Sequence, residues 1–421
     1  MSNAGERSTG SRASSRRGRI RPAIPPRVRT VIDRAGRRAV TAGLPPGWFD
    51  HRWVQGESLA ACLGRAAIAG APATIRAVHG PAVAQLPLPR NVQDRHRLPA
   101  DRGWWGYAMR DVPSRPCGET AVVTLTDCTI AWYHRADGDF QPAILTGDRR
   151  SLDVREIRFR PGHRAPLRRR SHRLARATWI LERVYHNHAH WLTAHLPKLL
   201  VLEEHAPEHL AHVVLPPEPT PAMSATMAQL GLDPAAFPRW PGDGPLAVDE
   251  LTIVVNDRFR PELLRSVHQR LRPGDTAPGR RRVFVSRAGA ARRRLCNEEE
   301  LWPILRRHGF ERVRLEALSP AAQAELLADT AVLCGPHGAG LANMLLCPPG
   351  LQVVEIADLG FPNPNFYATA AAVGHDYWLV AGRAAGPGSP LERDLEVDPA
   401  ALEAVVRQLP GSPAETTLPG R

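Results

Sequence analysis

The second half of the chain has a regular alternation of short apolar runs and amphipathic runs. The apolar runs predict strands at 282–286, 312–315, 330–334, 351–356 and 377–381. The runs between them predict helices at 261–271, after Asn297, from Ser319 and at 365–373. Strands that alternate with helices in this way indicate a parallel sheet in an α/β domain.

The first half is less regular. Two strands are expected at 121–125 and 129–133, joined by a turn at Asp127 and Cys128. A helical region runs from Arg183 to His205, with one apolar stripe of leucines. Pro197 interrupts that stripe, so we expect a kink or two consecutive helices.

A glycine loop, Gly335–Leu341, follows the expected strand 330–334 and precedes a helix-like run. Three glycines in six residues let the backbone approach a ligand closely, and N–H groups at a helix start attract anions. Ser286, Arg287 and Glu355 also fall at carboxyl ends of expected strands, where α/β sheets bind ligands. The pattern favours a phosphate-bearing ligand; the alternative is a glycine turn that packs a helix on the sheet.

Composition and charge indicate the number of domains, the cellular location and the character of the N-terminal segment. At 421 residues and 43% hydrophobic content, two or three domains are expected. No apolar run approaches the roughly 18 residues of a membrane span, and nothing in the cysteine spacing requires disulfides, which favours a cytoplasmic location. Eleven arginines stand against Glu6 and Asp33 in residues 1–39. This predicts a disordered basic tail over residues 1–40, either solvated or in peripheral contact with anionic lipid or another polyanion.

Several motifs, in order and at similar spacing, resemble glycosyltransferase family 61. The downstream set comprises Val285–Arg287, Arg293–Glu298, Gly309–Phe310, Gln323, Gly335–Asn343, Pro348–Gly350 and Val354–Ile356. The upstream set comprises Asn187–Leu192 and Leu196–Leu199. The resemblance covers roughly residues 180–360.

The resemblance implies a GT-B-like α/β fold with two Rossmann-like domains facing a cleft. On that basis we expect an acceptor-side domain over 41–255, a nucleotide-sugar-binding domain over 256–385, and a C-terminal helix and flexible tail over 386–421. The implied reaction is inverting transfer from a nucleotide sugar, usually a UDP-sugar, with no essential metal or cofactor. The implied acceptor is a glycan or lipid-linked hydroxyl in surface polysaccharide synthesis.

Chemistry assigns roles to the matching residues. Without a metal, the negative charge on a leaving diphosphate has to be met by arginines and backbone N–H groups. The expected nucleotide-sugar-binding residues are Ser286, Arg287, Arg293, Arg294, His337, Gly338, Ala339, Gly340, Asn343 and Glu355.

A catalytic base is also needed to take the proton of the acceptor hydroxyl, and the imidazole of His190 is the first candidate. The family usually has an acidic residue four positions after that histidine, where this chain has Ala194. His195, Glu203 and Glu204 are the possible replacements.

Three other functions remain open from the sequence. His186 and His190 have the i, i+4 spacing of zinc ligands on a helix. The net charge of +13 fits a protein that binds nucleic acid or another polyanion. Ala194 leaves room for a transferase-like scaffold without catalytic activity.

Overall fold

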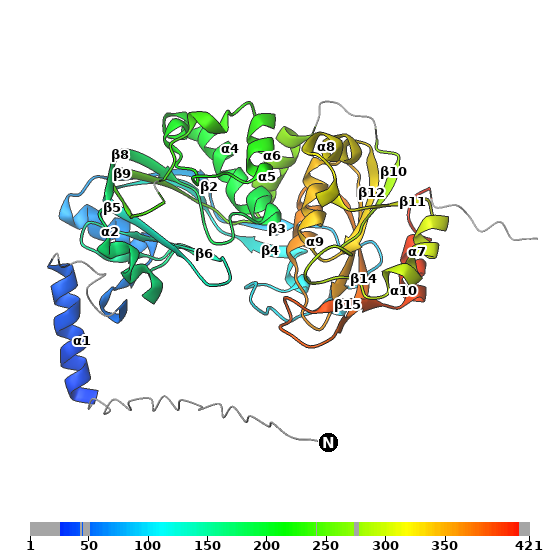
Figure 1. Ribbon diagram of the computed structural model, residues 1–421, viewed down its shortest axis with the longest axis horizontal. Coiled ribbons are helices and arrows are strands. Elements are labelled where there is room, and N and C mark those ends of the chain that lie inside the picture. The colour runs from blue at the N-terminus through cyan, green and yellow to red at the C-terminus, as the bar shows by residue number, and fades with distance from the viewer. Residues whose placement is uncertain (1–25, 43, 45–50, 241, 273–277, 412–421) are drawn as a thin grey trace, which may run out of the picture.

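The computed structural model describes residues 26–42, 44, 51–240, 242–272 and 278–411. Two β-sheets lie side by side along the long axis of the molecule, with helices between them (Figure 1). We call the part built on the first sheet (residues 51–255) the first lobe and the part built on the second (residues 256–411) the second lobe. The chain is therefore an α/β protein with more than one sheet.

The sheet of the second lobe is the parallel sheet that the sequence predicts. Its strand order is β11-β10-β12-β13-β14-β15, and only the pairing of β14 with β15 is antiparallel. The strands are β10 Arg281–Val285, β11 Phe310–Val313, β12 Thr330–Pro336, β13 Gln352–Asp358, β14 Asp376–Ala385 and β15 Asp394–Val397. The helices of this lobe are α6 Pro261–Leu271, α7 Glu298–Arg307, α8 Pro320–Ala328, α9 Asn365–Ala372 and α10 Pro399–Val406.

Helices cover both faces of this sheet, which explains the unbroken apolar runs. Successive residues of one strand point to opposite faces. In β12, Leu333 belongs to the larger hydrophobic core, whereas Val332 and Cys334 belong to a smaller core that contains residues of α7 and α10. When a strand is buried on both faces, every position along it is apolar, so the usual alternation of apolar and polar residues is lost. Such a strand is then recognised in the sequence by its short length.

The sheet of the first lobe is different from the expected Rossmann-like domain. Its order is β1-β7-β6-β5-β9-β8, with β2 paired to β5, and most of its pairings are antiparallel. The strands are β1 Gly56–Glu57, β2 Ala73–His79, β5 Thr120–His134, β6 Phe140–Leu145, β7 Ser151–Leu152, β8 His172–Trp179 and β9 Leu246–Val255. A Rossmann-like domain requires a parallel sheet, which only the second lobe provides in the described residues.

The expected turn at Asp127 is also wrong, because the two predicted strands form the single strand β5. Asp127 adopts a φ of 50°, yet Thr126 and Cys128 on either side of it both pair with β9. Aspartate tolerates the left-handed region, so the strand continues past Asp127, where the sequence pattern indicated a break.

The helical region before His205 is split, as the proline predicts. Asn187 caps α3 (His188–His190), a π-helical turn follows at Trp191–His195, and α4 (Leu196–His205) continues the run. Pro197 has no N–H to donate in an α-helical ladder, and the N–H of Leu196 reaches back five residues to the carbonyl of Trp191. The remaining helices of this half are α2 Leu59–Ala69 and α5 Pro221–Gln229.

The arginine-rich start of the chain is partly helical. Residues 26–41 form α1 (Pro26–Thr41), so the expected disorder does not hold for them, and residues 1–25 lie outside the described residues. None of the helices in the described residues has the length and apolar character needed to cross a bilayer.

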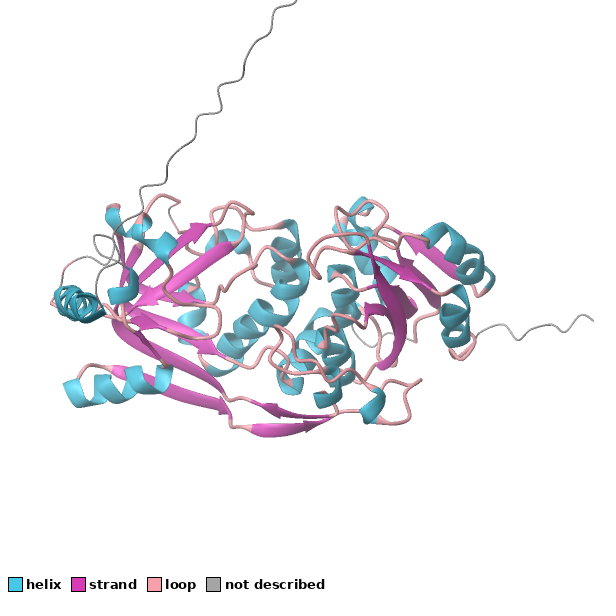
Figure 2. Ribbon diagram, turned by 90° about the horizontal axis from the view of Figure 1, so that it is seen from below, coloured by secondary structure: helices cyan, strands magenta, loops and turns pink. Residues whose placement is uncertain are grey.

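A segment of the first lobe crosses to the second and ties the two together. We call residues 86–112 the crossover segment. Its Asn91 side chain bonds both backbone groups of Leu379 in β14, and its Tyr107 hydroxyl donates to Asn365 at the start of α9 (3.0 Å). The short hairpin of β3 (Ala82–Gln85) and β4 (Ser114–Cys117) flanks this segment, as Figure 2 shows at the lower edge of the molecule. The crossover segment thus fixes the first lobe to the second.

Candidate functional site

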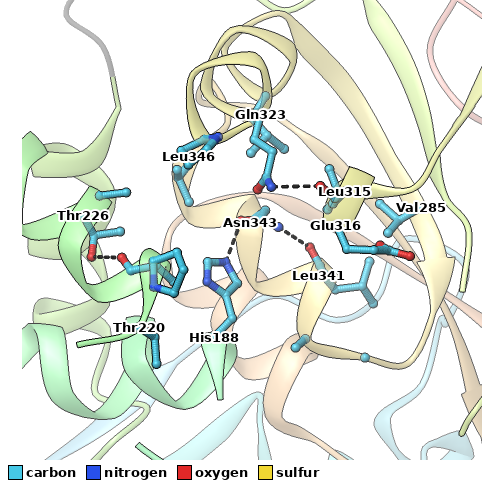
Figure 3. Close-up of a pocket in the computed structure, with 18 of the residues that line it drawn as sticks. His188, Thr220, Thr226, Val285, Leu315, Glu316, Gln323, Leu341, Asn343 and Leu346 are labelled. Carbon is cyan, nitrogen blue, oxygen red and sulfur yellow. Dashed lines mark hydrogen bonds between the residues drawn. The ribbon is translucent and has the colours of Figure 1, made fainter. Parts of the chain in front are cut away.

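A cavity of about 540 Å³ opens between the lobes at the carboxyl ends of β10, β11 and β12. One wall comes from the second lobe: residues after β10, the 3-10 turn after β11, helix α8 and the glycine loop. The opposite wall comes from α5 and the start of α3 (Figure 3). The polar or charged side chains of the lining are those of His186, His188, Thr220, Thr226, Gln229, Ser286, Arg287, Glu316, Gln323 and Asn343.

Arg287 is the cationic group of the second-lobe wall. Its Nε and one terminal nitrogen donate to the carbonyls of Arg293 and Arg292, both at 3.0 Å. The other terminal nitrogen lies beside Gly338, so close that a Cβ there would stand 2.3 Å from it. Burial lowers the pKa of this guanidinium, although an arginine stays charged at neutral pH. Two carbonyls thus hold the group in place while one N–H-bearing edge faces the glycine loop.

The glycine loop forms the floor of the cavity beside that guanidinium. Gly338, Ala339 and Gly340 line the cavity and lead into the 3-10 helix η11 (Ala339–Leu346). The first N–H groups of a helical run have no acceptor within it. Arg287 and Gly338–Gly340 line one corner of the cavity, and an arginine beside the start of a helical run is a combination that favours anions.

His188 and Asn343 connect the two walls. The Asn343 amide nitrogen donates to the Gly340 carbonyl (3.0 Å), which turns its oxygen toward His188. His188 Nε2 lies 2.8 Å from that oxygen and therefore carries the proton of this hydrogen bond (Figure 3). Burial lowers the pKa of His188 from its usual 6.5, which keeps the ring neutral at neutral pH. Its other nitrogen, Nδ1, is then an unprotonated base in the wall of the cavity.

Ser286 lines the cavity, but its hydroxyl is used in hydrogen bonds within the protein. Its hydroxyl donates to Glu298 at the first position of α7 (2.6 Å) and accepts the N–H of Ala288 (3.2 Å). The side chain is 3% exposed. Ser286 therefore anchors the β10 loop that carries Arg287.

His337 and Glu355 form a pair outside the cavity. His337 Nδ1 bonds the Glu355 carboxylate, whose other oxygen accepts from the Tyr377 hydroxyl at 2.7 Å. His337 Nε2 accepts from the amide of Asn363 (3.0 Å). Glu355 is 0% exposed, and its partners are a histidine and a tyrosine of the protein itself, away from the cavity in which a nucleotide sugar was expected.

The two arginines downstream of Arg287 also lie away from the cavity. Arg294 forms an exposed ion pair with Asp394 (2.7 Å) at the start of β15. Arg293, with a φ of 56°, lines a separate small hollow together with His337 and Trp105. Neither of them contributes to the lining that Arg287 shares with the glycine loop.

The expected catalytic histidines are placed differently from His188. His195 is 0% exposed; its Nδ1 donates to the His190 carbonyl (3.0 Å) and its Nε2 accepts the Glu182 N–H (3.1 Å). Burial and the nearby Lys198 charge lower its pKa to about 3. With both ring nitrogens bonded inside the core, His195 stabilises the π-helical turn.

His190 accepts a hydrogen bond from Arg258 (3.2 Å to Nδ1) and does not line the cavity. Burial and that cation lower its pKa well below the usual value. Glu203 is paired with Arg270 (2.7 Å), Glu204 is largely exposed, and Ala194 is buried in the π-helical turn. None of these three residues lines the cavity, so neither glutamate supplies the base that Ala194 lacks.

Three residues that line the cavity had no role in the expectations from the sequence: His188, Glu316 and Gln323. Gln323 belonged to the resemblance, and its amide nitrogen donates to the Leu315 carbonyl (2.8 Å), which orients the side chain. The sequence feature that could have indicated His188 is Asn187, an N-cap residue that places the next side chain in the first helical turn. Among the described residues, no three His, Cys, Asp or Glu side chains come together as a metal site would require.

Comparison with known proteins agrees with this geometry. No curated protein matches the chain. The model of the protein family described as Glycosyltransferase 61 matches residues 188–354. That stretch begins at His188 and contains Arg287, the glycine loop and Asn343, so it includes both walls of the cavity. Over residues 188–354 the chain is therefore similar to glycosyltransferase family 61, and this match supports a glycosyltransferase.

Proposed function

We propose that this enzyme transfers a sugar with inversion from a UDP-sugar to a hydroxyl of a glycan or lipid-linked acceptor, in surface polysaccharide synthesis, without a divalent metal. The donor lies in the cavity between the lobes. One observation carries the proposal: the Arg287 guanidinium lies against Gly338, and both line the same corner of that cavity together with Ala339 and Gly340.

That corner suits the departing diphosphate. As the bond between the sugar and the diphosphate breaks, negative charge grows on the diphosphate oxygens, and fixed donors stabilise this charge more than that of the bound donor. Arg287 is already held by two carbonyls, so little reorganisation is needed. Glu316 and the oxygen of Gln323, elsewhere on the second-lobe wall, offer acceptors for the ribose and the base.

His188 is our candidate for the general base. Inversion needs one displacement, in which the acceptor hydroxyl attacks the sugar carbon while its proton passes to a base on the acceptor side. Asn343 holds the Nε2 proton of His188, which leaves Nδ1 free to receive that proton. The histidine comes from the first lobe and the diphosphate corner from the second, so the reacting atoms lie between them.

Binding of UDP in the presence of EDTA, measured by calorimetry, tests the donor site. Arg287→Ala should weaken binding by about 10- to 100-fold, the loss typical of a hydrogen bond to a charged group. Arg383→Ala is the matched control, because Arg383 forms an exposed ion pair with Glu396 in the β14–β15 edge. Equal losses in both variants, or binding only after addition of Mn²⁺, would contradict the proposal.

Turnover with a panel of nucleotide sugars tests the base. His188→Ala should lower kcat by about 10²- to 10⁴-fold while UDP affinity stays close to that of the parent enzyme. His190→Ala should leave more activity, because His190 lies behind the wall against Arg258. The reverse order of the two variants would assign the base to His190, and product of retained anomeric configuration would contradict direct displacement.

A further inference from the structure

Helix α1 carries an apolar stripe that nothing in the described residues covers. Val28, Val31 and Ile32 are 49%, 67% and 42% exposed, and Ala35 is exposed beside them. At 3.6 residues per turn these four positions fall on one face of the helix. Isolated exposed apolar residues are ordinary on a protein surface, but a contiguous stripe on one helix marks an interaction site.

The helix is fixed to the first lobe by a different face. Trp53 Nε1 donates to the Asp33 carboxylate (3.0 Å), and Gly36 lies directly against the Trp53 ring. Val40, one turn further, is 2% exposed. Figure 1 shows α1 at the outer end of the first lobe, away from the helices between the lobes. The stripe is therefore presented outward by a helix that is already folded and attached.

Cations border the stripe on both sides. Arg34 and Arg38 follow one edge and Arg29 the other, and all three side chains are exposed. Asp33 is the only acidic residue of the helix, and it lies on the attached face. A helix whose apolar face is bordered by exposed arginines has the chemistry of an interfacial helix on an anionic bilayer.

We propose that α1 lies in the plane of an anionic membrane surface, with Val28, Val31 and Ile32 among the acyl chains and the bordering arginines at the lipid phosphates. A nucleic acid offers no partner for the apolar stripe. A second copy of the chain would bring the two arginine borders together, which like-charge repulsion opposes. The bilayer alone satisfies the apolar and the cationic features together, and this inference does not depend on the donor or the base proposed above.

Vesicle co-sedimentation of the full-length protein tests the inference. Binding should require phosphatidylglycerol in phosphatidylcholine vesicles and should weaken as salt rises. The variant Val31→Asp with Ile32→Asp should lose vesicle affinity by about tenfold or more. Val83→Asp is the matched control, because Val83 is 56% exposed on the β3 hairpin and lies outside the stripe. A charge-reversal variant, Arg34→Glu with Arg38→Glu, should lose binding to the anionic vesicles as well.

An unchanged melting temperature and an unchanged far-UV circular dichroism spectrum, both expected for every variant, show that each protein is folded. Equal vesicle binding by the parent and the Val31→Asp, Ile32→Asp variant would overturn the inference, as would binding that is indifferent to phosphatidylglycerol. Concentration-dependent dimers that this variant abolishes, without vesicle binding by the parent protein, would assign the stripe to a second copy and would also overturn it.

Discussion

At the scale of single residues, the cavity depends on the missing side chain of Gly338. A Cβ at this position would lie 2.3 Å from a terminal nitrogen of Arg287, so the guanidinium has to move. The obstacle is the end of a flexible side chain, so the fold should tolerate the change. We expect Gly338→Ala to weaken UDP binding by about tenfold, as an arginine hydrogen bond to phosphate is lost or misaligned. Calorimetry with UDP measures the loss.

The control for that prediction is Gly64→Ala in the exposed helix α2. A Cβ at Gly64 meets nothing within 4 Å, and alanine is favoured over glycine in a helix by about 1 kcal/mol. Gly64→Ala should raise the melting temperature slightly and leave UDP binding unchanged. If Gly338→Ala binds UDP like the parent, the guanidinium is not part of the donor site.

The protonation state of His188 sets a second prediction at this scale. Burial lowers its pKa below 6.5, so the ring is the neutral base at neutral pH, and kcat/KM should fall only as the pH drops through that lowered pKa. The hydrogen bond to Asn343 favours the charged ring; removing it with Asn343→Ala should move the acid limb to still lower pH. A pH–rate profile from about pH 4.5 to 8 resolves the limb. Persistence of the same limb in His188→Gln would assign it to another group.

At the scale of elements, buried charges join the end of the first sheet to the helix after the π-helical turn. Lys198 in α4 lies 2.6 Å from Glu182, and both residues are 2% exposed. Arg155 bonds the other carboxylate oxygen at 3.0 Å. Desolvation disfavours the ionised carboxyl, but the two cations outweigh it and hold the pKa of Glu182 well below its usual range. This cluster positions the helical run that begins with His188.

Lys198→Met should therefore destabilise the protein strongly. Removing one partner of a buried pair leaves an incompletely compensated charge and costs roughly 3–5 kcal/mol. The double variant with Glu182→Gln should recover part of that loss, because the uncompensated carboxylate is gone. Urea unfolding of the single and double variants measures the coupling. Losses that simply add would show that the pair contributes no coupling to the fold.

The helices and strands also show which parts of the fold could be predicted from the sequence. Strands buried on both faces and helices with clear caps were predictable, as with α8, whose Ser319 accepts the Ala322 N–H at 3.2 Å. The first sheet was not, because its pairings join β5 to strands that are distant along the chain, such as β9. The partner of Glu355 is a histidine 18 residues away on a neighbouring loop, which spacing alone cannot reveal. Contacts between residues distant in the sequence therefore limited the prediction of both the fold and the site.

At the scale of the molecule, the two lobes share one hydrophobic core. The larger core cluster contains Met109 and Val112 of the crossover segment, Leu251 of the first sheet and Tyr367 and Leu379 of the second lobe. The donor corner and the candidate base stand on opposite sides of a cavity whose floor this core supports. Their separation is thus set by packing between the lobes and not by a flexible linker.

This packing predicts that the lobes unfold together. Native-state hydrogen exchange should give peptides from β5 and from β13 the same opening free energy, because neither sheet can open without exposing the shared core. Asn91→Ala removes two hydrogen bonds between the crossover segment and β14, so it should lower both free energies equally. Gln85→Ala, in the exposed hairpin beside the segment, is the control and should lower neither. If β13 peptides opened at a lower free energy than β5 peptides, the lobes would be separate folding units, and a hinge between them would then control the distance between His188 and the donor corner.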